Sequence, residues 1–364
     1  MILIPTQWQE WTSIDKIEWF TSITKKEEVE NLLSSNKKII THVHHNEEEN
    51  KFRKNIGEFL KQIIGKDQFN IGKIIDYHIF TEWESSVAVK ITIEDGKEYI
   101  FKARNDSIIW WENKIYIEAK SLEIRKKLWV KTPEIYKKST IDFNGMEIPY
   151  IIMEYIKPTR KRTEENEKRI AYEIGENIAK IWKSEGKWFG QIKNIENEIP
   201  IGEYKNMEEY YDTLEKKIIK FFTEKNLISK KEIEKLHKAI QIIKNDFNSG
   251  TKTSLNHEDI QFDNIFLTDP ITVFDPNPQL WHPLADLVWT EFYLLSGNIK
   301  TTDKKIRKKS LWEWYEKTTG ERANKNVFNA CMTIRIFQKA RYRFAKWRER
   351  TEKLLKILDE IKLN

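Results

Sequence analysis

The sequence predicts an α+β protein with two lobes, the first built on an antiparallel sheet and the second mostly helical. Five short runs rich in β-branched and aromatic residues lie between residues 73 and 156, and two of their connections contain turn dipeptides. Beyond Pro158, amphipathic runs with helical spacing continue almost to the end of the chain. Strands gathered in one segment and helices in the next are typical of the α+β class.

The composition indicates a folded chain with a substantial core. Of 364 residues, 39% are hydrophobic and 12% aromatic, which excludes a disordered chain. No apolar run approaches the roughly 20 residues that span a bilayer, and the opening stretch lacks the basic and apolar regions of a secretory signal. The lone Cys331 cannot form an internal disulfide and is expected in the core. We therefore expect a cytoplasmic protein with no membrane segment.

Residues 1–70 are expected to form a helical N-terminal extension. Within it, the run from 51 to 65 ends at Gly65, a common helix stop, and places six apolar residues on one face: Phe52, Ile56, Phe59, Leu60, Ile63 and Ile64. The first lobe then covers residues 71–156 and the second lobe residues 157–364. No repeat or low-complexity linker separates the two lobes.

The elements of the first lobe follow from local patterns. The five strands are expected at 73–80, 85–93, 97–104, 133–140 and 148–156. Asp95-Gly96 and Asn144-Gly145 are hairpin turns, the first between the second and third strands and the second between the last two. A helix over 111–129 follows the third strand, with apolar residues at Ile117, Leu122, Ile124 and Leu128.

The second lobe is expected to be helical with one exception. Amphipathic helices are predicted over 169–182, 207–222 and 231–247, and several more between 310 and 362. The exception is a small hairpin made by "NIFLT" and "ITVFD", which are joined at Asp269-Pro270.

A cluster of polar residues surrounds this hairpin, in the stretch "NHEDIQFDNIFLTDPITVFDPNP" that starts at residue 256. Phosphoryl transfer needs a divalent metal on the phosphates and a carboxylate that orients the acceptor hydroxyl. Asn264 and Asp275 offer the hard oxygen ligands that Mg²⁺ prefers, and Asp259 can accept the hydroxyl proton. The alternative is an Asx-rich polar turn between two strands.

The residues "HEDIQFDN", "VFDPNP" and "HPLADLVW" resemble the catalytic core of the aminoglycoside phosphotransferase and choline kinase group. Members of that group are ATP-dependent small-molecule kinases with a protein-kinase-like fold. The resemblance covers residues from about 72 to 295. It implies Asp259 as the catalytic base, Asn264 and Asp275 as Mg²⁺ ligands, and Asp286 as a structural acid that braces the loop near His257.

The resemblance extends to the first lobe and implies that this lobe binds the nucleotide. Lys102 in "YIFKAR" matches the lysine that holds the α and β phosphates, and Glu118 on the following helix matches its ion-pair partner, with Glu123 as the second candidate. "IPYIIMEYIKP" resembles the segment that joins the lobes. There the backbone of Glu154 and Ile156 would hold adenine, and Met153 would lie at the back of the pocket, although a methionine here is more often a core residue.

The chain departs from the family pattern in the loop that covers the phosphates. "FTEWESSVAVK" has no glycine, so Ser85 and Ser86 are the candidate phosphate donors, while Glu82 and Glu84 would repel a triphosphate if they faced inward. A second departure is Glu258, where many relatives have glycine. Because of these departures, a second alternative stays open: a catalytically degenerate protein of this fold that binds nucleotide or acts as an interaction protein. A protein kinase is a further alternative, but Asp286 follows Asp275 by only eleven positions, which leaves little room for an activation loop.

The acceptor is expected to be a small molecule with a hydroxyl group, such as an aminoglycoside-like antibiotic, a choline-like amino alcohol or a sugar. Residues 301–364 contain 18 Lys or Arg against 8 Asp or Glu. We interpret the basic run "QKARYRFAKWRER" as an amphipathic helix rather than a nucleic-acid surface, which stays an alternative. The acidic run 194–211 would suit a cationic acceptor and the basic helices an anionic one. The sequence predicts no oligomeric state.

Overall fold

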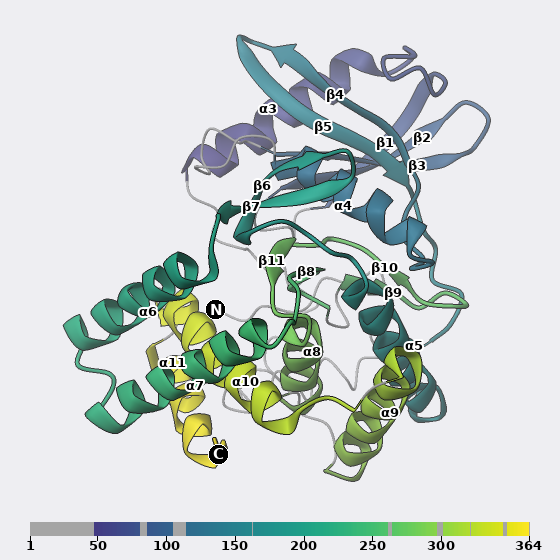
Figure 1. Ribbon diagram of the computed structural model, residues 1–364. Helices are drawn as coiled ribbons and strands as arrows, with labels where there is room; N and C mark the ends of the chain where they lie inside the picture. The colour runs from purple at the N-terminus through teal and green to yellow at the C-terminus, as the bar shows by residue number, and fades with distance from the viewer. Residues whose placement is uncertain are drawn as a thin grey trace, which may run out of the picture. The chain divides into compact units, whose positions relative to one another are not determined.

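The computed structural model describes residues 47–80, 86–104, 114–161, 163–260, 264–296, 301–320, 322–344 and 348–363. The chain divides into two units, whose elements Figure 1 labels. The first unit holds the residues up to Glu123, Thr132–Lys161 and Ile265–Phe274, and the second holds Ile124–Lys131, Arg162–Asn264 and Asp275–Asn364. A sheet-based unit and a mostly helical unit confirm the predicted α+β class.

The first unit is built on a five-stranded antiparallel sheet with the strand order β1-β2-β3-β5-β4. The strands are β1 (Ile74–Phe80), β2 (Val87–Ile93), β3 (Glu98–Ala103), β4 (Ile135–Phe143) and β5 (Met146–Glu154). Asn144 and Gly145 have φ values of 55° and 72°, as the two central residues of a tight hairpin turn require. The predicted strands and both predicted turns are therefore confirmed.

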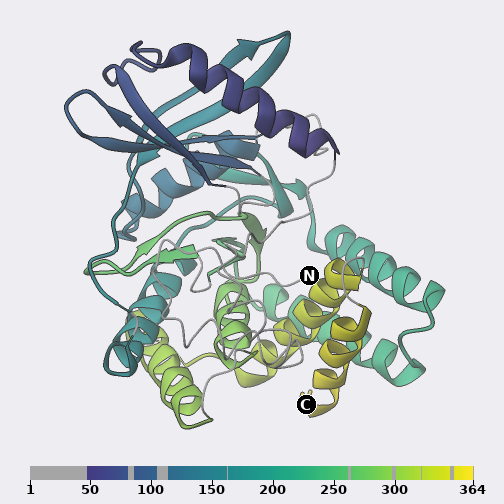
Figure 2. The same cartoon turned by 180° about the vertical axis from the view of Figure 1, so that it is seen from behind.

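Helix α3 (Glu47–Ile63) packs on this sheet and lies across its strands in Figure 2. The predicted apolar face is buried together with strand residues: Phe52, Ile56, Phe59, Leu60 and Ile63 share a core with Val89, Phe101 and Tyr150. Ile64 is the exception, at 41% exposed, because the helix ends at Ile63 and Gly65 turns the chain away with a φ of 77°. The described part of the predicted extension thus shares the core of the sheet.

Helix α4 (Lys114–Lys127) buries a different face from the predicted one. Ile117, Ile124 and Leu128 are partly exposed, and Leu122 is buried as predicted. The buried face also includes two charged residues and two small ones, in the set Ile115, Glu118, Ala119, Ser121 and Arg125. Apolar spacing located the wrong face because polar side chains occupy part of the buried one.

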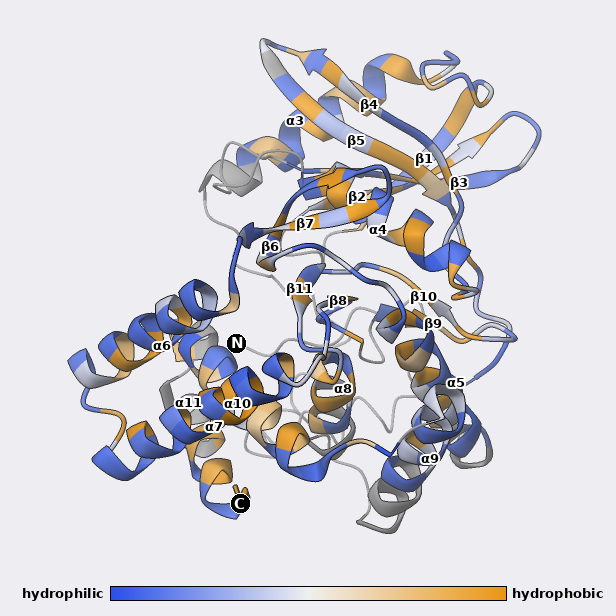
Figure 3. Ribbon diagram, viewed as in Figure 1, coloured by the Kyte–Doolittle hydropathy of each residue, from blue (hydrophilic) through white to orange (hydrophobic). Residues whose placement is uncertain are grey.

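The second unit contains helices α5 (Glu164–Trp182), α6 (Met207–Glu224), α7 (Lys230–Asn248), α8 (Ala285–Ser296), α9 (Thr301–Thr319), α10 (Lys325–Phe344) and α11 (Arg348–Lys356). Helices α5 and α9 lie side by side in Figures 1 and 2, and α10 contacts α6, α7, α8 and α11. Orange and blue residues alternate along α6 and α7 in Figure 3, as expected of amphipathic helices. Cys331 is buried in α10, as predicted. No helix in the described ranges is long and apolar enough to cross a membrane.

A four-stranded sheet in the second unit corrects the prediction of an almost wholly helical lobe. Its order is β7-β6-β11-β8, with β6 (Phe189–Glu196), β7 (Ile199–Tyr204), β8 (Ser254–Asn256) and β11 (Gln279–Trp281). The β6–β7 turn uses Asn197 and Glu198 at φ values of 48° and 68°, so the usual glycine signal is missing. The predicted small hairpin is confirmed as β9 (Ile265–Phe266) and β10 (Thr272–Val273), which belong to the first unit.

Candidate active site

The loop after β8 brings together two of the predicted site residues. Asn264 donates from Nδ2 to the Oδ2 atom of Asp259 at 2.7 Å and to the Asp259 carbonyl at 2.9 Å. Trp289 of α8 donates from Nε1 to the other carboxylate oxygen of Asp259 at 3.3 Å. The Asp259 side chain is thus held from both sides in one orientation.

The nitrogen of the Asn264 amide, and not its oxygen, faces Asp259. The amide nitrogen makes both contacts with Asp259, so the Oδ1 atom of Asn264 is the one that can ligate a metal. Asp275 follows β10 in the left-handed region, with a φ of 53°, a conformation that is uncommon for residues other than glycine and is concentrated at functional sites. One amide oxygen and one carboxylate fit Mg²⁺, which keeps several waters. No cluster of three His, Cys, Asp or Glu that could hold a metal occurs among the described residues.

Burial raises the pKa of Asp259 above its usual value. The positive charge of Lys339 and the hydrogen bond from Trp289 lower it, while the negative charge of Asp275 raises it further. The net effect is a raised pKa, which makes the carboxylate a stronger proton acceptor than an ordinary aspartate.

Asp286, in the first turn of α8, holds the backbone of the same loop. Its Oδ2 accepts the backbone N–H of His257 and its Oδ1 that of Glu258, both at 2.7 Å. Asp286 is 1% exposed, and burial raises its pKa to about 7, although the His257 N–H and the charge of Arg125 oppose the rise. The His257 side chain is buried, and its carbonyl accepts the N–H of Asn277 at 2.9 Å.

The candidate phosphate-binding pair lies in the first unit. Lys102 on β3 donates from Nζ to the Oε1 atom of Glu118 on α4 at 2.5 Å, and both residues are buried. The second candidate, Glu123, instead pairs with Lys138 at 2.5 Å and Lys120 at 3.1 Å. Of the two acids left open by the sequence, the structure therefore pairs Glu118 with Lys102.

The hinge candidates are the last two residues of β5, Met153 and Glu154, and Ile156, which follows the strand in the same unit. The Glu154 N–H donates to the Glu134 carbonyl at 2.9 Å, so this group is already engaged. The side chain of Ile156 is buried against Phe266 and Phe274. Met153 packs in an apolar cluster with Ala88, Ile100, Ile115, Ala119 and Ile151, so its side chain is part of the core.

The ends of the predicted phosphate-covering loop are described, but Ser85, Glu82 and Glu84 lie outside the described residues. Ser86 is 6% exposed, and its carbonyl accepts a hydrogen bond from Arg53 of α3 at 3.2 Å. The other nitrogen of the Arg53 guanidinium donates to the Phe80 carbonyl at 3.4 Å. One arginine therefore joins the end of β1 to the start of β2.

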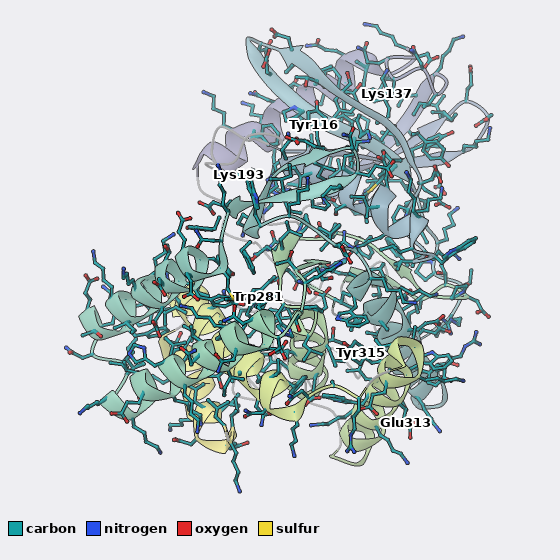
Figure 4. The ribbon with its side chains drawn as sticks, in the orientation of Figure 1. Tyr116, Lys137, Lys193, Trp281, Glu313 and Tyr315 are labelled. Carbon is teal, nitrogen blue, oxygen red and sulfur yellow. The ribbon has the colours of Figure 1, made fainter. Side chains whose placement is uncertain are left out.

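Four residues near the catalytic loop were not assigned from the sequence: Arg335, Lys339, Trp281 and Trp289. Arg335 of α10 pairs with Glu258 and lies over the rings of Trp281 and Trp289, at 4.9 and 5.2 Å from their centroids. Trp281, labelled in Figure 4, is 1% exposed. Lys339, one helical turn after Arg335, lies 4.5 Å from the Trp289 centroid. Lys339, from the basic run of α10, thus lies at this site. The two tryptophans that flank the segment "HPLADLV", Trp281 and Trp289, were the only signal in the sequence that could have indicated these contacts.

The fold is that of small-molecule kinases with a protein-kinase-like architecture. A candidate fructosamine-3-kinase from Thermobifida fusca YX-ER1 is 13% identical, with 84% of this chain and 98% of that chain covered and a TM-score of 0.57. A thermostable mutant of aminoglycoside phosphotransferase APH(4)-Ia, in a complex with ADP and hygromycin B, is 12% identical over 84% and 97% of the chains, with a TM-score of 0.56.

Amicoumacin kinase hAmiN, in complex with AMP-PNP, Ca²⁺ and Ami, is 12% identical over 86% and 94% of the chains, with a TM-score of 0.54. No family model and no curated protein sequence matches the chain. The fold expected from the sequence resemblance is confirmed by these structures.

Proposed function

We propose that the chain is an ATP- and Mg²⁺-dependent phosphotransferase that acts on a hydroxyl group of a small molecule. The observation that carries the proposal is the contact between Asn264 and Asp259, which fixes a carboxylate beside an amide whose oxygen could bind a metal. The buried Lys102–Glu118 pair and the nucleotide complexes of the structural neighbours support it.

Each residue then has a separate task. Lys102 binds the α and β phosphates and is held in place by Glu118. Asn264 and Asp275 would hold Mg²⁺, which neutralises phosphate charge when bound. Asp286 fixes the loop through the backbone of His257 and Glu258. The backbone of Ile156 and the carbonyl of Glu154 would contact adenine, and the Ser86 region would face the phosphates.

The transfer step is a displacement at the γ-phosphorus. The acceptor oxygen forms a bond to phosphorus while the bond to the β,γ-bridging oxygen breaks, and ADP leaves with that electron pair. The hydroxyl proton passes to Asp259 late in the transfer. The raised pKa of Asp259 favours this last step.

The test separates nucleotide binding from turnover. Calorimetry should show ATP binding that depends on Mg²⁺, and D259N should retain this binding while turnover of any accepted hydroxyl compound falls by about 100-fold or more. D269N, at an exposed turn residue of the adjacent hairpin, is the matched control and should leave both unchanged. Absence of Mg²⁺-dependent binding, or full turnover by D259N, contradicts the proposal.

The second candidate is a nucleotide-binding protein without catalysis. It is favoured by the glycine-free loop between β1 and β2. This candidate predicts ATP binding with no release of ADP in the presence of any hydroxyl compound. The same binding and turnover measurements therefore distinguish the two functions.

A further inference from the structure

A buried ion pair joins α10 to the loop that carries Asp259. Arg335 of α10 pairs with Glu258, the residue immediately before Asp259 in the chain, and the two side chains are 9% and 2% exposed. Burial lowers the pKa of Arg335 to about 10, so the guanidinium is still a cation at neutral pH. The contact is therefore an ion pair that is largely excluded from water.

The same guanidinium contacts the tryptophan that orients Asp259. Its Cζ atom lies 5.2 Å from the centroid of the Trp289 ring, within the range of a cation–π interaction. The Trp289 N–H donates to the Oδ1 atom of Asp259 at 3.3 Å. Arg335 thus contacts both the residue that precedes Asp259 in the chain and a residue that holds its carboxylate.

Arg335 is itself fixed by further contacts. Its Nη1 atom donates to the Oε1 atom of Gln338, one helical turn later on α10, at 2.8 Å. Its Cζ atom lies 4.9 Å from the centroid of Trp281, which is buried and donates its own N–H to Tyr211. Contacts with a carboxylate, an amide and two rings hold a planar guanidinium in one orientation.

The backbone of Glu258 has a conformation that its contacts maintain. Its φ is 70°, in the left-handed region that glycine adopts without strain and other residues adopt at a cost in free energy. Such a conformation persists where the surrounding contacts determine it. The Glu258 N–H donates to Asp286 at 2.7 Å, and its carboxylate pairs with Arg335. Arg335 therefore helps to set the backbone at the residue next to Asp259.

Stability alone does not account for this pair. Removal of an arginine and a glutamate from water commonly costs as much free energy as their attraction returns, and apolar side chains of similar volume often stabilise a core as well or better. Both partners are linked to Asp259, Glu258 through the chain and Arg335 through Trp289. These links indicate a role in holding the candidate proton acceptor.

We propose that Arg335 is a positioning residue of the candidate active site, which fixes the Asp259 carboxylate through Glu258 and Trp289. The inference rests on the proposed phosphotransferase function, in which Asp259 accepts the hydroxyl proton. A carboxylate displaced by about 1 Å loses the alignment that the transfer requires. Loss of Arg335 should therefore lower kcat, with little change in the KM for ATP.

Steady-state kinetics test the positioning role. R335M should lower kcat by about tenfold to 100-fold and change the KM for ATP by less than about threefold. R335K keeps the positive charge and should retain a larger kcat than R335M. The matched control is R341M, because Arg341 is an exposed arginine of the same helix that also lies over a ring, 5.9 Å from the Phe221 centroid. R341M should leave kcat unchanged.

The double variant E258M/R335M separates positioning from stability. It replaces both ions with unbranched apolar side chains, so its urea midpoint should exceed those of E258M and R335M. Its kcat should stay low, and the variant supplies a folded protein for the kinetic comparison where R335M is unstable. Recovery of kcat together with the urea midpoint, wild-type kcat in R335M, or a rise in the KM for ATP alone overturns the inference.

Hydrogen exchange at the Trp289 indole separates this inference from the proposed function. Exchange of the indole N–H, assigned by its absence in W289F, should be about tenfold faster in R335M and E258M/R335M than in wild type, and unchanged in R341M. Faster exchange in a protein that shows no phosphotransfer would contradict the proposed function and leave the positioning contact in place. Phosphotransfer by the wild type with unchanged exchange in R335M would overturn the inference alone.

Discussion

Asp286 and Trp289 lie three residues apart on α8 and fix the same loop in different ways. Asp286 accepts two backbone N–H groups of the loop, and Trp289 donates to the side chain of Asp259. Thr290, the next residue, donates to the Ile260 carbonyl at 3.0 Å. Residues three and four positions apart share a helix face, so a single face of α8 positions the candidate catalytic residue.

The first prediction concerns the Trp289 hydrogen bond. Since this bond lowers the pKa of Asp259 against the effect of burial, W289F should raise that pKa further. The acid limb of the pH profile of kcat/KM should move to higher pH, because Asp259 must lose its proton before it can act as the base. Steady-state turnover between pH 4 and pH 9 measures the shift.

The control for this prediction is W281F. Trp281 also donates its indole N–H, but to the Tyr211 hydroxyl at 2.6 Å. This variant loses a buried hydrogen bond of similar type and should leave the acid limb in place. An unchanged profile in W289F, or the same shift in W281F, would show that the Asp259 contact does not set the pH dependence.

The fold of the first unit could be predicted because its signals are local. Alternating β-branched residues and the dipeptides Asp95-Gly96 and Asn144-Gly145 mark strands and turns within a few residues of each other. The β6–β7 hairpin was missed because its turn places two non-glycine residues, Asn197 and Glu198, at positive φ. The hairpin pairs through β6 with β11, which comes much later in the chain, and a local pattern does not report this pairing.

The site residues that could be predicted lie in motifs that resemble the family pattern, including the separated pairs Asp286–His257 and Lys102–Glu118. Asp259 and Asn264 were assigned from one motif in which they lie five positions apart, and the structure adds that their side chains are in contact. Arg335 of α10 pairs with Glu258, which is far from it in the sequence, so no spacing rule predicts the pair. The sequence could not decide whether Glu118 or Glu123 pairs with Lys102, because both acids are on the same helix. The packing of α4 decides it, since Glu118 contacts Lys102 and Glu123 contacts Lys138.

The second prediction separates these two acids. E118Q leaves the buried Lys102 without its carboxylate, and the free energy of unfolding should fall by about 3–5 kcal/mol. E123Q removes a partner that is 33% exposed and should cost less than about 1 kcal/mol. Urea unfolding measures both, and the KM for ATP should rise only for E118Q.

A double variant tests whether the Lys102–Glu118 pair serves function as well as stability. K102M/E118L replaces the buried ions with apolar side chains, which should recover much of the stability lost in E118Q. ATP affinity should stay low because the cation is gone. Recovery of ATP binding by the double variant would show that Lys102 does not contact phosphate.

The third prediction concerns pH and a buried pair outside the candidate site. His282 contacts Asp246 at 3.0 Å through Nε2, and its Nδ1 accepts the Leu284 N–H at 3.1 Å, so the imidazole is neutral. Burial lowers the pKa of His282, against the attraction of Asp246. The pKa of Asp246 is lowered chiefly by its bond to His282, against burial.

Both pKa shifts are downward, so the unfolded chain binds these protons more readily than the folded protein. Stability from the pair is complete above about pH 6.5, the unfolded value for histidine. It should decrease as the pH falls, first through His282 and then, below about pH 3.8, through Asp246. Chemical unfolding at a series of pH values should show both decreases in wild type and only the first in D246N. T251V, which removes the 2.6 Å bond from Thr251 to Asp246, should reduce the second decrease in part.

The last prediction concerns Arg53, which joins the Phe80 and Ser86 carbonyls at 3.4 and 3.2 Å. R53M should lower the free energy of unfolding by about 1–3 kcal/mol, because two carbonyls lose a charged donor. Amide hydrogen exchange should accelerate at the adjacent ends of β1 and β2. Because the loop between these ends is the proposed cover of the phosphates, the KM for ATP should rise by a larger factor than kcat falls. K54M, at the exposed neighbouring position, should change stability by less than about 0.5 kcal/mol. Faster exchange in R53M with an unchanged KM for ATP would show that Arg53 stabilises the sheet without positioning the nucleotide.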